Sequence, residues 1–241
     1  MVSKNQLKLI KSLHQKKYRN AHGLFLVEGK KTVKELLNSN FNLFQIFTTE
    51  ANIPLFKSEN VLEISNSDLK KISSLQNPNG VLGVFKIPEP VPIDFSNWLV
   101  VLDDVRDPGN LGTIIRLCDW FGIKNIVCSI ETVDCYNPKV LQATMGSITR
   151  VAICYKDLEK FLQESNLPVY GTFMEGNSIY KETYPKAGIL IFGNEGKGIS
   201  PRLNDLIKKR ITIPQFGKTT TESLNVATAT AIVLSAVIGN N

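Results

Sequence analysis

The feature that most limits the fold is the alternation of short apolar runs with helical patterns over residues 98–241. The β-branched runs WLVVLD, IKNIVCS, VAICY and GILIFG are each followed by a segment with helical spacing. Strands that alternate with helices favour a mostly parallel sheet with both faces covered. We therefore expect an α/β fold. The pattern alone indicates an open, doubly wound sheet, because threaded chains are very rare.

A proline-rich stretch precedes this region. Residues 87–97, IPEPVPIDFSN, hold three prolines and no periodic pattern, which is typical of a linker. The chain has 241 residues, and domains usually have about 100 to 200. We predict one domain over 1–88, a linker over 89–97 and a second domain over 98–241. The first reads as a small α/β unit, with expected helices at 3–15, 30–38 and 66–75 and strands at 24–29, 44–49, 61–65 and 80–85.

Composition indicates a soluble, globular protein. Hydrophobic residues make up 43% and charged residues 21%, and no apolar run approaches the roughly 20 residues that cross a bilayer. The N-terminal segment is basic but has no apolar run behind it, so we expect no secretory signal and a cytoplasmic location. The spacing of Cys118, Cys128, Cys135 and Cys154 fits neither zinc nor a disulfide framework, so we expect buried free thiols and no metal site.

The positive charge lies at the N-terminus. Residues 1–34 hold nine Lys or Arg and one acid, which gives this segment a charge of +8. The net charge of the whole chain is +6, so the remaining residues together carry −2. One interpretation is a solvated helix face. The other is a surface for an RNA backbone, where clustered cations release counterions. The candidate contacts are Lys4, Lys8, Lys11, Lys16, Lys17, Arg19, Lys30 and Lys31.

Unusual residues gather where predicted strands end. The loops LVVLDDVRDPGNLG, FGNEGKGIS and PQFGKTTTESLN each follow a strand. Ligands of open parallel sheets bind outside the carboxyl ends of the strands. We therefore expect these three loops to form one site.

The first loop carries Asn110, Gly112 and Arg116 at N-x-G-x-x-x-R spacing. Its Pro-Gly pair makes a turn and Asn110 is placed to cap the helix, so a well-capped helix start is one interpretation. Arg116 falls among apolar residues, where a guanidinium usually has an acidic partner or an anionic ligand.

The second loop has glycines at G-x-x-G-x-G, with Glu195 between Gly193 and Gly196. This order matches neither the Walker loop nor the dinucleotide fingerprint. Glu195 would also repel a phosphate at close range. A tight turn, with Ser200 as N-cap before Pro201, explains part of the stretch. The rest indicates a cationic ligand with a flat base that approaches the backbone closely.

The third stretch leads into a helix rich in small residues. Ser223 is expected to cap this helix and Asn225 to lie in its first turn. The alanines allow close packing against the sheet or against a second subunit, and both remain open.

These three stretches, in this order, resemble the SpoU-type branch of the SPOUT superfamily, RNA ribose 2′-O-methyltransferases that use S-adenosylmethionine. The resemblance covers about residues 98–241. It rests on Asn110, Gly112 and Arg116, then Gly193, Glu195, Gly196 and Gly198, then Ile213, Pro214, Ser223, Leu224 and Asn225. The stretch YNPKVLQATMGS (136–147) is similar to the family segment between the first two motifs. VEGKKTVKELL (27–37) and NPNGVLGVF (77–85) are similar to the ribosomal-protein-like α/β domain with which many members hold RNA.

The resemblance implies a C-terminal trefoil knot in place of an open sheet, S-adenosylmethionine as cofactor, and a homodimer. It assigns cofactor contacts to Gly193, Gly196, Ile213, Pro214, Leu224 and Asn225. It assigns catalysis to Arg116, with Asn110, Glu195, Ser223 and Asn225 positioning the substrate. Because an arginine pKa lies above ~12, we expect Arg116 to stabilise the developing alkoxide by hydrogen bonding and not to act as a base.

Two other functions are weighed against this one. A non-catalytic RNA-binding protein would keep the N-terminal domain and use the second only to dimerise, and a cofactor titration separates the two. A nucleotide-dependent enzyme is disfavoured because no complete phosphate loop is present. The stretch Gly217 to Ser223 is longer than the resemblance leads us to expect, and the choice between transfer and ribosomal RNA is left open.

Overall fold

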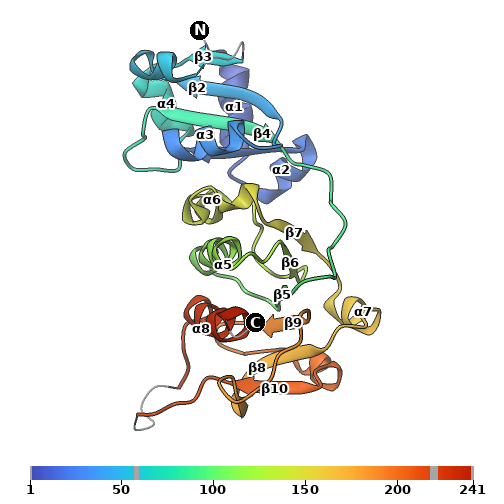
Figure 1. Cartoon of the computed structure of the whole chain (residues 1–241). Helices are drawn as coiled ribbons and strands as arrows, with labels where there is room; N and C mark the ends of the chain where they lie inside the picture. The colour runs from blue at the N-terminus through green and yellow to red at the C-terminus, as the bar shows by residue number, and fades with distance from the viewer. Residues whose placement is uncertain (1, 57–59, 218–221, 240–241) are drawn as a thin grey trace. The chain divides into compact units, whose positions relative to one another are not determined.

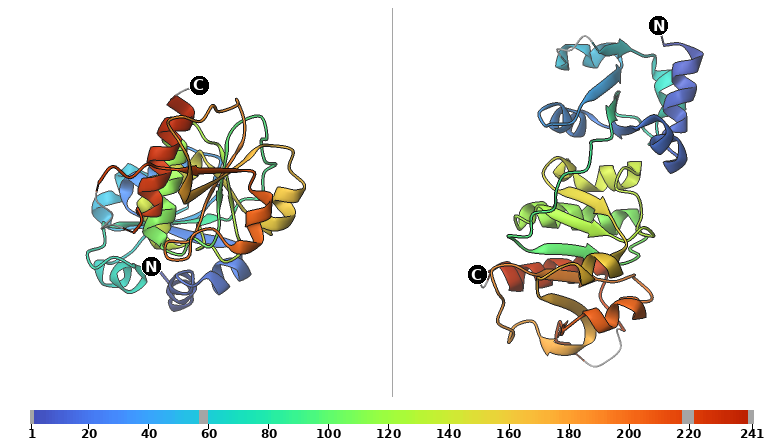
Figure 2. Two further views of the ribbon diagram at one scale, coloured as in Figure 1. Left: turned by 90° about the horizontal axis from the view of Figure 1, so that it is seen from below. Right: turned by 90° about the vertical axis from the view of Figure 1, so that its right-hand side faces the viewer.

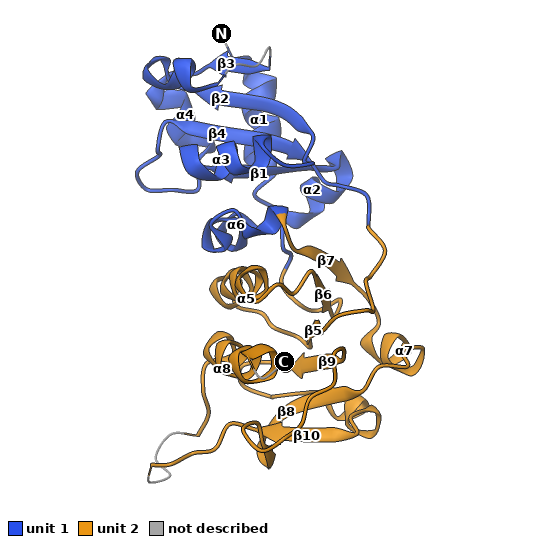
Figure 3. Ribbon diagram, viewed as in Figure 1, with its two compact units in different colours: residues 1–90, 134–149 blue, residues 91–133, 150–241 orange. Residues whose placement is uncertain are grey.

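The chain folds into two compact units. The computed structural model describes residues 2–56, 60–217 and 222–239. Unit 1 comprises the residues up to Pro90 together with Asp134–Thr149, and unit 2 comprises Val91–Val133 and the residues from Arg150 onward (Figure 3). One boundary thus falls within the proline-rich stretch 87–97. The others set a short internal segment apart from its sequence neighbours.

Unit 2 is built on a parallel sheet with strand order β10-β8-β9-β5-β6-β7 (Figure 1). Each neighbouring pair runs parallel, and the central strands align Val101 with Val127 on one side and with Ile191 on the other. The α/β fold with a parallel sheet is therefore confirmed, while the trefoil knot stays a prediction. The strands are β5 (Leu99–Leu102), β6 (Asn125–Cys128), β7 (Ala152–Tyr155), β8 (Val169–Ser178), β9 (Ile189–Phe192) and β10 (Lys209–Thr212).

Helices cover both faces of this sheet. Helices α5 (Pro108–Trp120) and α8 (Val226–Gly239) lie on one face, and α7 (Leu158–Gln163) and the 3-10 helix η3 (Pro201–Leu206) on the other (Figure 2). Successive residues of a strand point to opposite faces, so β5 and β9, buried throughout, supply a core to each side. The α7 side contains Val101, Ile191, Phe161 and Leu203. Within the segment SPRLNDLIKK only Pro201–Leu206 is helical, as the 3-10 helix η3, and Ser200 makes no side-chain cap there.

Strand β8 departs from the regular ladder. Its Gly171 aligns with Arg210, but the next residue of β10, Ile211, aligns with Asn177. The intervening residues 172–176 therefore bulge out of register, where the hydroxyl of Thr212 donates to the Met174 carbonyl at 3.0 Å. A bulge re-aims side chains. Strand β8, with 10 residues, is longer than the strand expected from PVYGTF.

Unit 1 has a mixed sheet of order β1-β4-β2-β3, in which only β2 and β3 pair in parallel. Apolar residues of α1, its C-cap and α4 pack on it, among them Ile10, Leu13 and Leu69. The helix expected at 3–15 corresponds to α1, which ends at Ser12, and a second helix, α2, begins at Lys16, beyond the expected range. The elements are α1 (Lys4–Ser12), α2 (Lys16–His22), β1 (Leu24–Glu28), α3 (Lys30–Leu37), β2 (Leu43–Thr48), η1 (Glu50–Leu55), β3 (Val61–Glu63), α4 (Asn66–Ile72) and β4 (Val81–Lys86).

The internal segment, Asp134–Thr149, carries α6 (Pro138–Thr144) and η2 (Ser147–Thr149) and belongs to unit 1. Its Tyr136 ring lies 4.6 Å from the Phe25 ring. Its Asp134 accepts a hydrogen bond from Nε of Arg19 at 2.9 Å, and the same guanidinium donates to the carbonyls of Leu13 and His14. Arg19 is 2% exposed.

Arg19 is therefore a structural residue. We expected it to contact RNA, but its guanidinium is buried and its hydrogen bonds are made within unit 1. Buried arginines are normally paired in this way.

Three of the four cysteines are buried and Cys154 is half-buried. Burial raises the pKa of the Cys118 thiol, which makes it a poor nucleophile at neutral pH. In the described part of the chain, no group of three or more His, Cys, Asp or Glu side chains is arranged to hold a metal. None of the described helices combines the length and the apolar character that a bilayer span requires.

Replacing Asp134 tests the buried ion pair. We expect Asp134→Ala to lower the free energy of unfolding by about 3 to 5 kcal/mol, because it leaves the Arg19 charge buried without its partner. The control is Asp119→Ala, which removes the partner of the half-exposed Arg150 and should cost about 1 kcal/mol or less. Urea denaturation followed by far-ultraviolet circular dichroism measures both, and equal losses would contradict the assignment.

Candidate functional site

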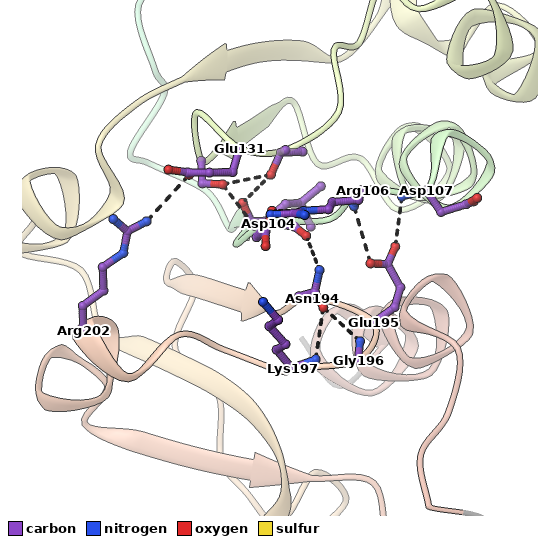
Figure 4. A network of polar contacts seen from close by, with 12 residues as sticks. Asp104, Arg106, Asp107, Glu131, Asn194, Glu195, Gly196, Lys197 and Arg202 are labelled. Atoms are coloured by element: carbon purple, nitrogen blue, oxygen red, sulfur yellow. Dashed lines mark hydrogen bonds and ion pairs between the residues drawn. The ribbon is translucent and has the colours of Figure 1, made fainter.

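Two loops start side by side at the carboxyl edge of the unit 2 sheet. Strands β5 and β9 are parallel neighbours, and their last residues, Leu102 and Phe192, are paired. The loops that follow, residues 103–107 and 193–200, are therefore brought together, as the position of their sequence motifs predicts. Figure 4 shows the polar contacts that join them.

Asn194 fixes the second loop to the first. Its side-chain nitrogen donates to the Asp104 carbonyl at 2.7 Å. Its side-chain oxygen accepts from the backbone N–H groups of Gly196 and Lys197, both at 3.0 Å (Figure 4). One amide thus closes its own turn and ties that turn to the neighbouring loop.

Asp104 adopts a backbone conformation that is uncommon for a residue with a side chain. Its φ is 57°. The conformation is held from several sides, because its N–H donates to the Ser129 hydroxyl, its carbonyl accepts from Asn194, and its carboxylate accepts from Nε of Arg106. Such outliers cluster at functional sites.

Glu195 lies at the N-terminus of α5. Its carboxylate accepts from the side-chain nitrogen of Asn110 at 2.9 Å and, more weakly, from the backbone N–H groups of Arg106 and Asp107 at 3.4 and 3.3 Å. A helix N-terminus favours negative charge. The place that a phosphate would take in a phosphate-binding loop is thus held by a carboxylate of the protein itself.

The caps of both helices differ from the expected ones. Asp107, not Asn110, caps α5 by accepting from the Asn110 N–H at 2.8 Å. Asn225, not Ser223, caps α8 by accepting from the N–H groups of Ala227 and Thr228. Capping requires the residue just outside the first helical turn, and α8 begins at Val226, three residues after Ser223.

A chain of side chains joins the three motifs. Asn110 donates to Glu195, and its side-chain oxygen accepts from the side-chain nitrogen of Asn225 at 2.8 Å. The orientation of the Asn110 amide is therefore set from both ends. The motifs around Asn110, Glu195 and Asn225 meet, as expected.

Two of the glycines serve the loop itself. A Cβ on Gly193 would lie 2.1 Å from the carbonyl carbon of Gly198, and Gly198 has a φ of +67°. By contrast, a Cβ on Gly196 would meet nothing closer than 3.8 Å. The missing side chain of Gly193 lets residues 194 and 198 pair, and the contact of this glycine with a ligand stays a prediction.

A cavity of about 740 Å³ lies beside this loop. Glu195, Ser223 and five of the six residues expected to contact the cofactor line it, namely Gly193, Gly196, Ile213, Pro214 and Leu224. Asn225 does not, because its side chain is turned to Asn110 and the helix start. The bulge of β8 adds Thr172, Phe173 and Met174, and α8 adds Val226, Ala229 and Val233.

The charged groups on the cavity wall are of both signs. Glu195 and Glu222 supply carboxylates, and Lys197 and Arg210 supply cations. The guanidinium carbon of Arg210 lies 3.5 Å from the centre of the Phe173 ring, a cation–π contact that holds this side chain against the wall.

Arg116 stands apart from the linked motifs. It is exposed on α5, six residues after Asn110 and therefore about 9 Å further along the helix axis. In the described ranges, its side chain makes no hydrogen bond or ion pair. Thr113, Arg116 and Trp120 share one exposed face of the helix, and Trp120 is 84% exposed. An acidic partner, one of the two expectations for Arg116, is thus not found among the described residues.

The residues that sequence reasoning missed lie beside those it found. Asn194 follows Gly193 and lies two residues before Gly196, and an asparagine among glycines is typical of a side chain that closes a turn. Asp107 precedes Pro108, a usual start of a helix. The buried Asp103, which accepts from the Ser200 N–H at 2.7 Å, carries no such signal.

The expected RNA contacts other than Arg19 are exposed in unit 1: Lys4, Lys8, Lys11, Lys16, Lys17, Lys30 and Lys31. Of the long stretch Gly217 to Ser223, residues 218–221 lie outside the described residues.

Two protein-family models match the chain, one in each half. Residues 97–235 match the model of the SpoU rRNA methylase family, and residues 4–83 match that of the MRM3-like substrate binding domain. The 23S rRNA (guanosine(2553)-2′-O)-methyltransferase of Bacillus subtilis is 32% identical over 240 residues, 96% of each chain.

Solved structures agree along nearly the whole length. A TrmH-family protein from Porphyromonas gingivalis is 38% identical with a TM-score of 0.91, covering 98% of both chains. The AdoMet-bound rRNA methyltransferase of Sinorhizobium meliloti is 30% identical with a TM-score of 0.86, covering 98% of this chain and 95% of that one. The three linked motifs and these matches agree: the chain belongs to the SpoU rRNA methylase family.

Proposed function

We propose that this protein transfers a methyl group from S-adenosylmethionine to a ribose 2′-hydroxyl of RNA, with the cofactor in the unit 2 cavity. The observation that carries the proposal is that five residues chosen from sequence as cofactor contacts line one cavity at the carboxyl edge of the sheet. The 2′-O-methyltransferase from Bacillus subtilis and the AdoMet-bound structure from Sinorhizobium meliloti support the reaction and the cofactor.

The cavity suits this cofactor. Its volume of about 740 Å³ lies within the range of roughly 300 to 1,000 Å³ usual for small-molecule sites. Ile213, Leu224 and Val233 offer apolar surface for an adenine, and Glu195 and Glu222 offer carboxylates to a sulfonium cation. The bound cofactor supplies an electrophilic methyl group.

The polar residues then position and activate the substrate hydroxyl. We assign to Arg116 the contact with the substrate's phosphate and the stabilisation of charge that develops on the 2′-oxygen, because its guanidinium is exposed and makes no bond within the described residues. Asn110, Glu195 and Asn225 form the linked set that orients neighbouring groups, and Ser223 lies on the cavity wall.

Unit 1 holds the RNA. Its exposed lysines on α1, α2 and α3 give an electrostatic surface for phosphates. We propose that the substrate is ribosomal RNA, as in the name of the Bacillus subtilis relative. We also propose that the protein acts in the cytoplasm. The guanosine of that relative's name is not carried over.

We further propose that the protein is a homodimer. Trp120 exposes 84% of its surface on α5, and α8, which packs against α5, is apolar on nearly every side. A large aromatic side chain left in water beside an apolar helix is typical of a protein interface.

The proposal is tested by methyl transfer to RNA. RNA from cells that lack this protein, incubated with the purified protein and S-adenosylmethionine, should gain a ribose methylation that mapping places at a site methylated in normal cells. Absence of both cofactor binding and transfer would instead favour a non-catalytic RNA-binding protein.

Replacing Arg116 separates catalysis from cofactor binding. We expect Arg116→Ala to lower methyl transfer by at least about a hundredfold, since removal of one oxyanion donor costs that much. Calorimetric binding of S-adenosylmethionine should survive. Arg150→Ala, which removes another exposed arginine of unit 2, is the control and should keep its turnover. Near-normal turnover of Arg116→Ala would refute the assignment.

Two glycine variants test the shape of the cavity wall. We expect Gly193→Ala to weaken S-adenosylmethionine binding strongly, because the added methyl group overlaps the backbone at Gly198. Gly217→Ala is the control, because among the described residues its methyl group meets nothing within 4 Å and Gly217 does not line the cavity, so it should bind nearly as the parent protein does. Isothermal calorimetry compares them, and similar affinities for the two variants would show that this wall does not shape the site.

The dimer is tested at Trp120. We expect the parent protein to have twice the mass of one chain by light scattering, and Trp120→Glu to shift the mass towards that of one chain, because it places a charge in an apolar contact. The exposed Phe95→Glu is the control for a surface aromatic elsewhere in unit 2. If Trp120→Glu remained a dimer, the interface would have to lie elsewhere than at α5.

A further inference from the structure

Unit 1 contains a second cavity, of about 460 Å³. Three stretches that the sequence singled out supply its lining: the start of α3 with the end of β1, the segment that leads to β4, and α6. Its lining residues belong to unit 1 alone, so the cavity is separate from the proposed cofactor site.

One wall is a face of α6 and is largely apolar. Pro138, Leu141, Gln142 and Met145 line the cavity, at the i, i+3, i+4 and i+7 positions that share one side of a helix. Met145 is 47% exposed and ends the helix in a left-handed conformation with φ of 52°. A thioether and a leucine side by side offer a flat ring a polarizable, apolar surface.

The opposite wall is polar and positive. It is formed by Gly29, Lys30, Lys31 and Thr32 at the first turn of α3. Gly29, the N-cap, has no side chain to satisfy the free N–H groups of this turn. Free N–H groups and two lysines at a helix N-terminus attract a phosphate.

The polar side chains of the cavity divide into two kinds. Glu28 is fully engaged, because it accepts from the Ser74 N–H at 2.8 Å, from the Ser74 hydroxyl at 2.6 Å and from the Ser73 hydroxyl. Its carboxylate therefore holds the loop at Ser73 and Ser74 in place, and it is not free to repel an anionic ligand. By contrast, the side chains of Lys31, Asn79 and Gln142 have no hydrogen bond or ion pair within the ranges described, so they are available to a ligand.

We propose that this cavity binds one unpaired nucleotide of the RNA substrate. The phosphate lies at the start of α3 with Lys30 and Lys31, the base packs against Leu141 and Met145, and the amides of Asn79 and Gln142 reach the base edge. Sequence-specific RNA recognition usually takes unstacked bases in this manner, and a cavity of this volume holds a nucleotide but no duplex. The choice of RNA as ligand rests on the proposed function, whereas the site uses no part of the cofactor cavity.

Matched variants test the cavity in the full-length protein. Gln142→Trp fills it from α6, and Lys139→Trp changes an exposed residue of the same helix that does not line it. Lys31→Glu reverses a lining charge, and Lys70→Glu reverses an exposed charge of α4 outside the cavity. The probe is a short fluorescent single-stranded RNA of mixed sequence, compared with the same RNA annealed to its complement, and fluorescence anisotropy gives the affinities without cofactor.

We expect Gln142→Trp and Lys31→Glu each to weaken single-strand binding about tenfold or more, as loss of one base contact does. The two controls should stay within about threefold, and duplex binding should change less than single-strand binding. Equal losses in lining and control variants, or equal losses for single strand and duplex, would overturn the proposal. So would free nucleoside 5′-monophosphates that bind as tightly as the RNA, since the ligand would then be a small molecule.

A second readout keeps the two proposals distinct. S-adenosylmethionine binding, measured by calorimetry on the same proteins, should be unchanged by the lining variants. A parent protein that binds no S-adenosylmethionine would refute the proposed function and leave the RNA comparison intact. A parent protein that binds the cofactor, with lining variants that bind single-stranded RNA normally, would refute the nucleotide site alone.

Discussion

The candidate catalytic site depends on the contact between the loop after β9 and the loop after β5. Two adjacent residues make it: Asn194 bonds to the carbonyl of Asp104, and Glu195 bonds to Asn110 and to the start of α5. Because β5 and β9 are parallel neighbours, both loops leave the sheet at one edge. The glycine at 193 lets the second loop fold tightly enough for Glu195 to reach its partners.

This contact explains why a loop with phosphate-loop composition does not behave as one. In a phosphate-binding loop, the helix N-terminus is left open for an anion. Here Glu195, from the loop after β9, already occupies that position at α5. The negative charge at this position is therefore fixed by the protein, beside a cavity whose wall carries charges of both signs.

Much of the fold could be predicted from the sequence, and each wrong prediction has a physical reason. Strands such as β5 and β9 are continuous apolar runs, so their positions follow from hydrophobicity, and the shared edge at which their loops lie follows from their connectivity. Caps were harder, because Ser223 and Asn225 have similar propensities and only the observed start of α8 decides between them. The burial of Arg19 depends on Asp134, 115 residues away, and composition carries no sign of such a pairing.

Because residues Asp134–Thr149 belong to unit 1, the two units are not two consecutive stretches of the sequence. The chain passes between the units three times, after Pro90, after Val133 and after Thr149. A protein cut at the proline-rich stretch would leave its first piece with a buried guanidinium lacking its counter-charge and with Phe25 lacking the ring of Tyr136. Unit 1 is thus discontinuous in sequence, so replacing it in this chain requires exchanging two stretches together, the residues up to Pro90 and the segment Asp134–Thr149.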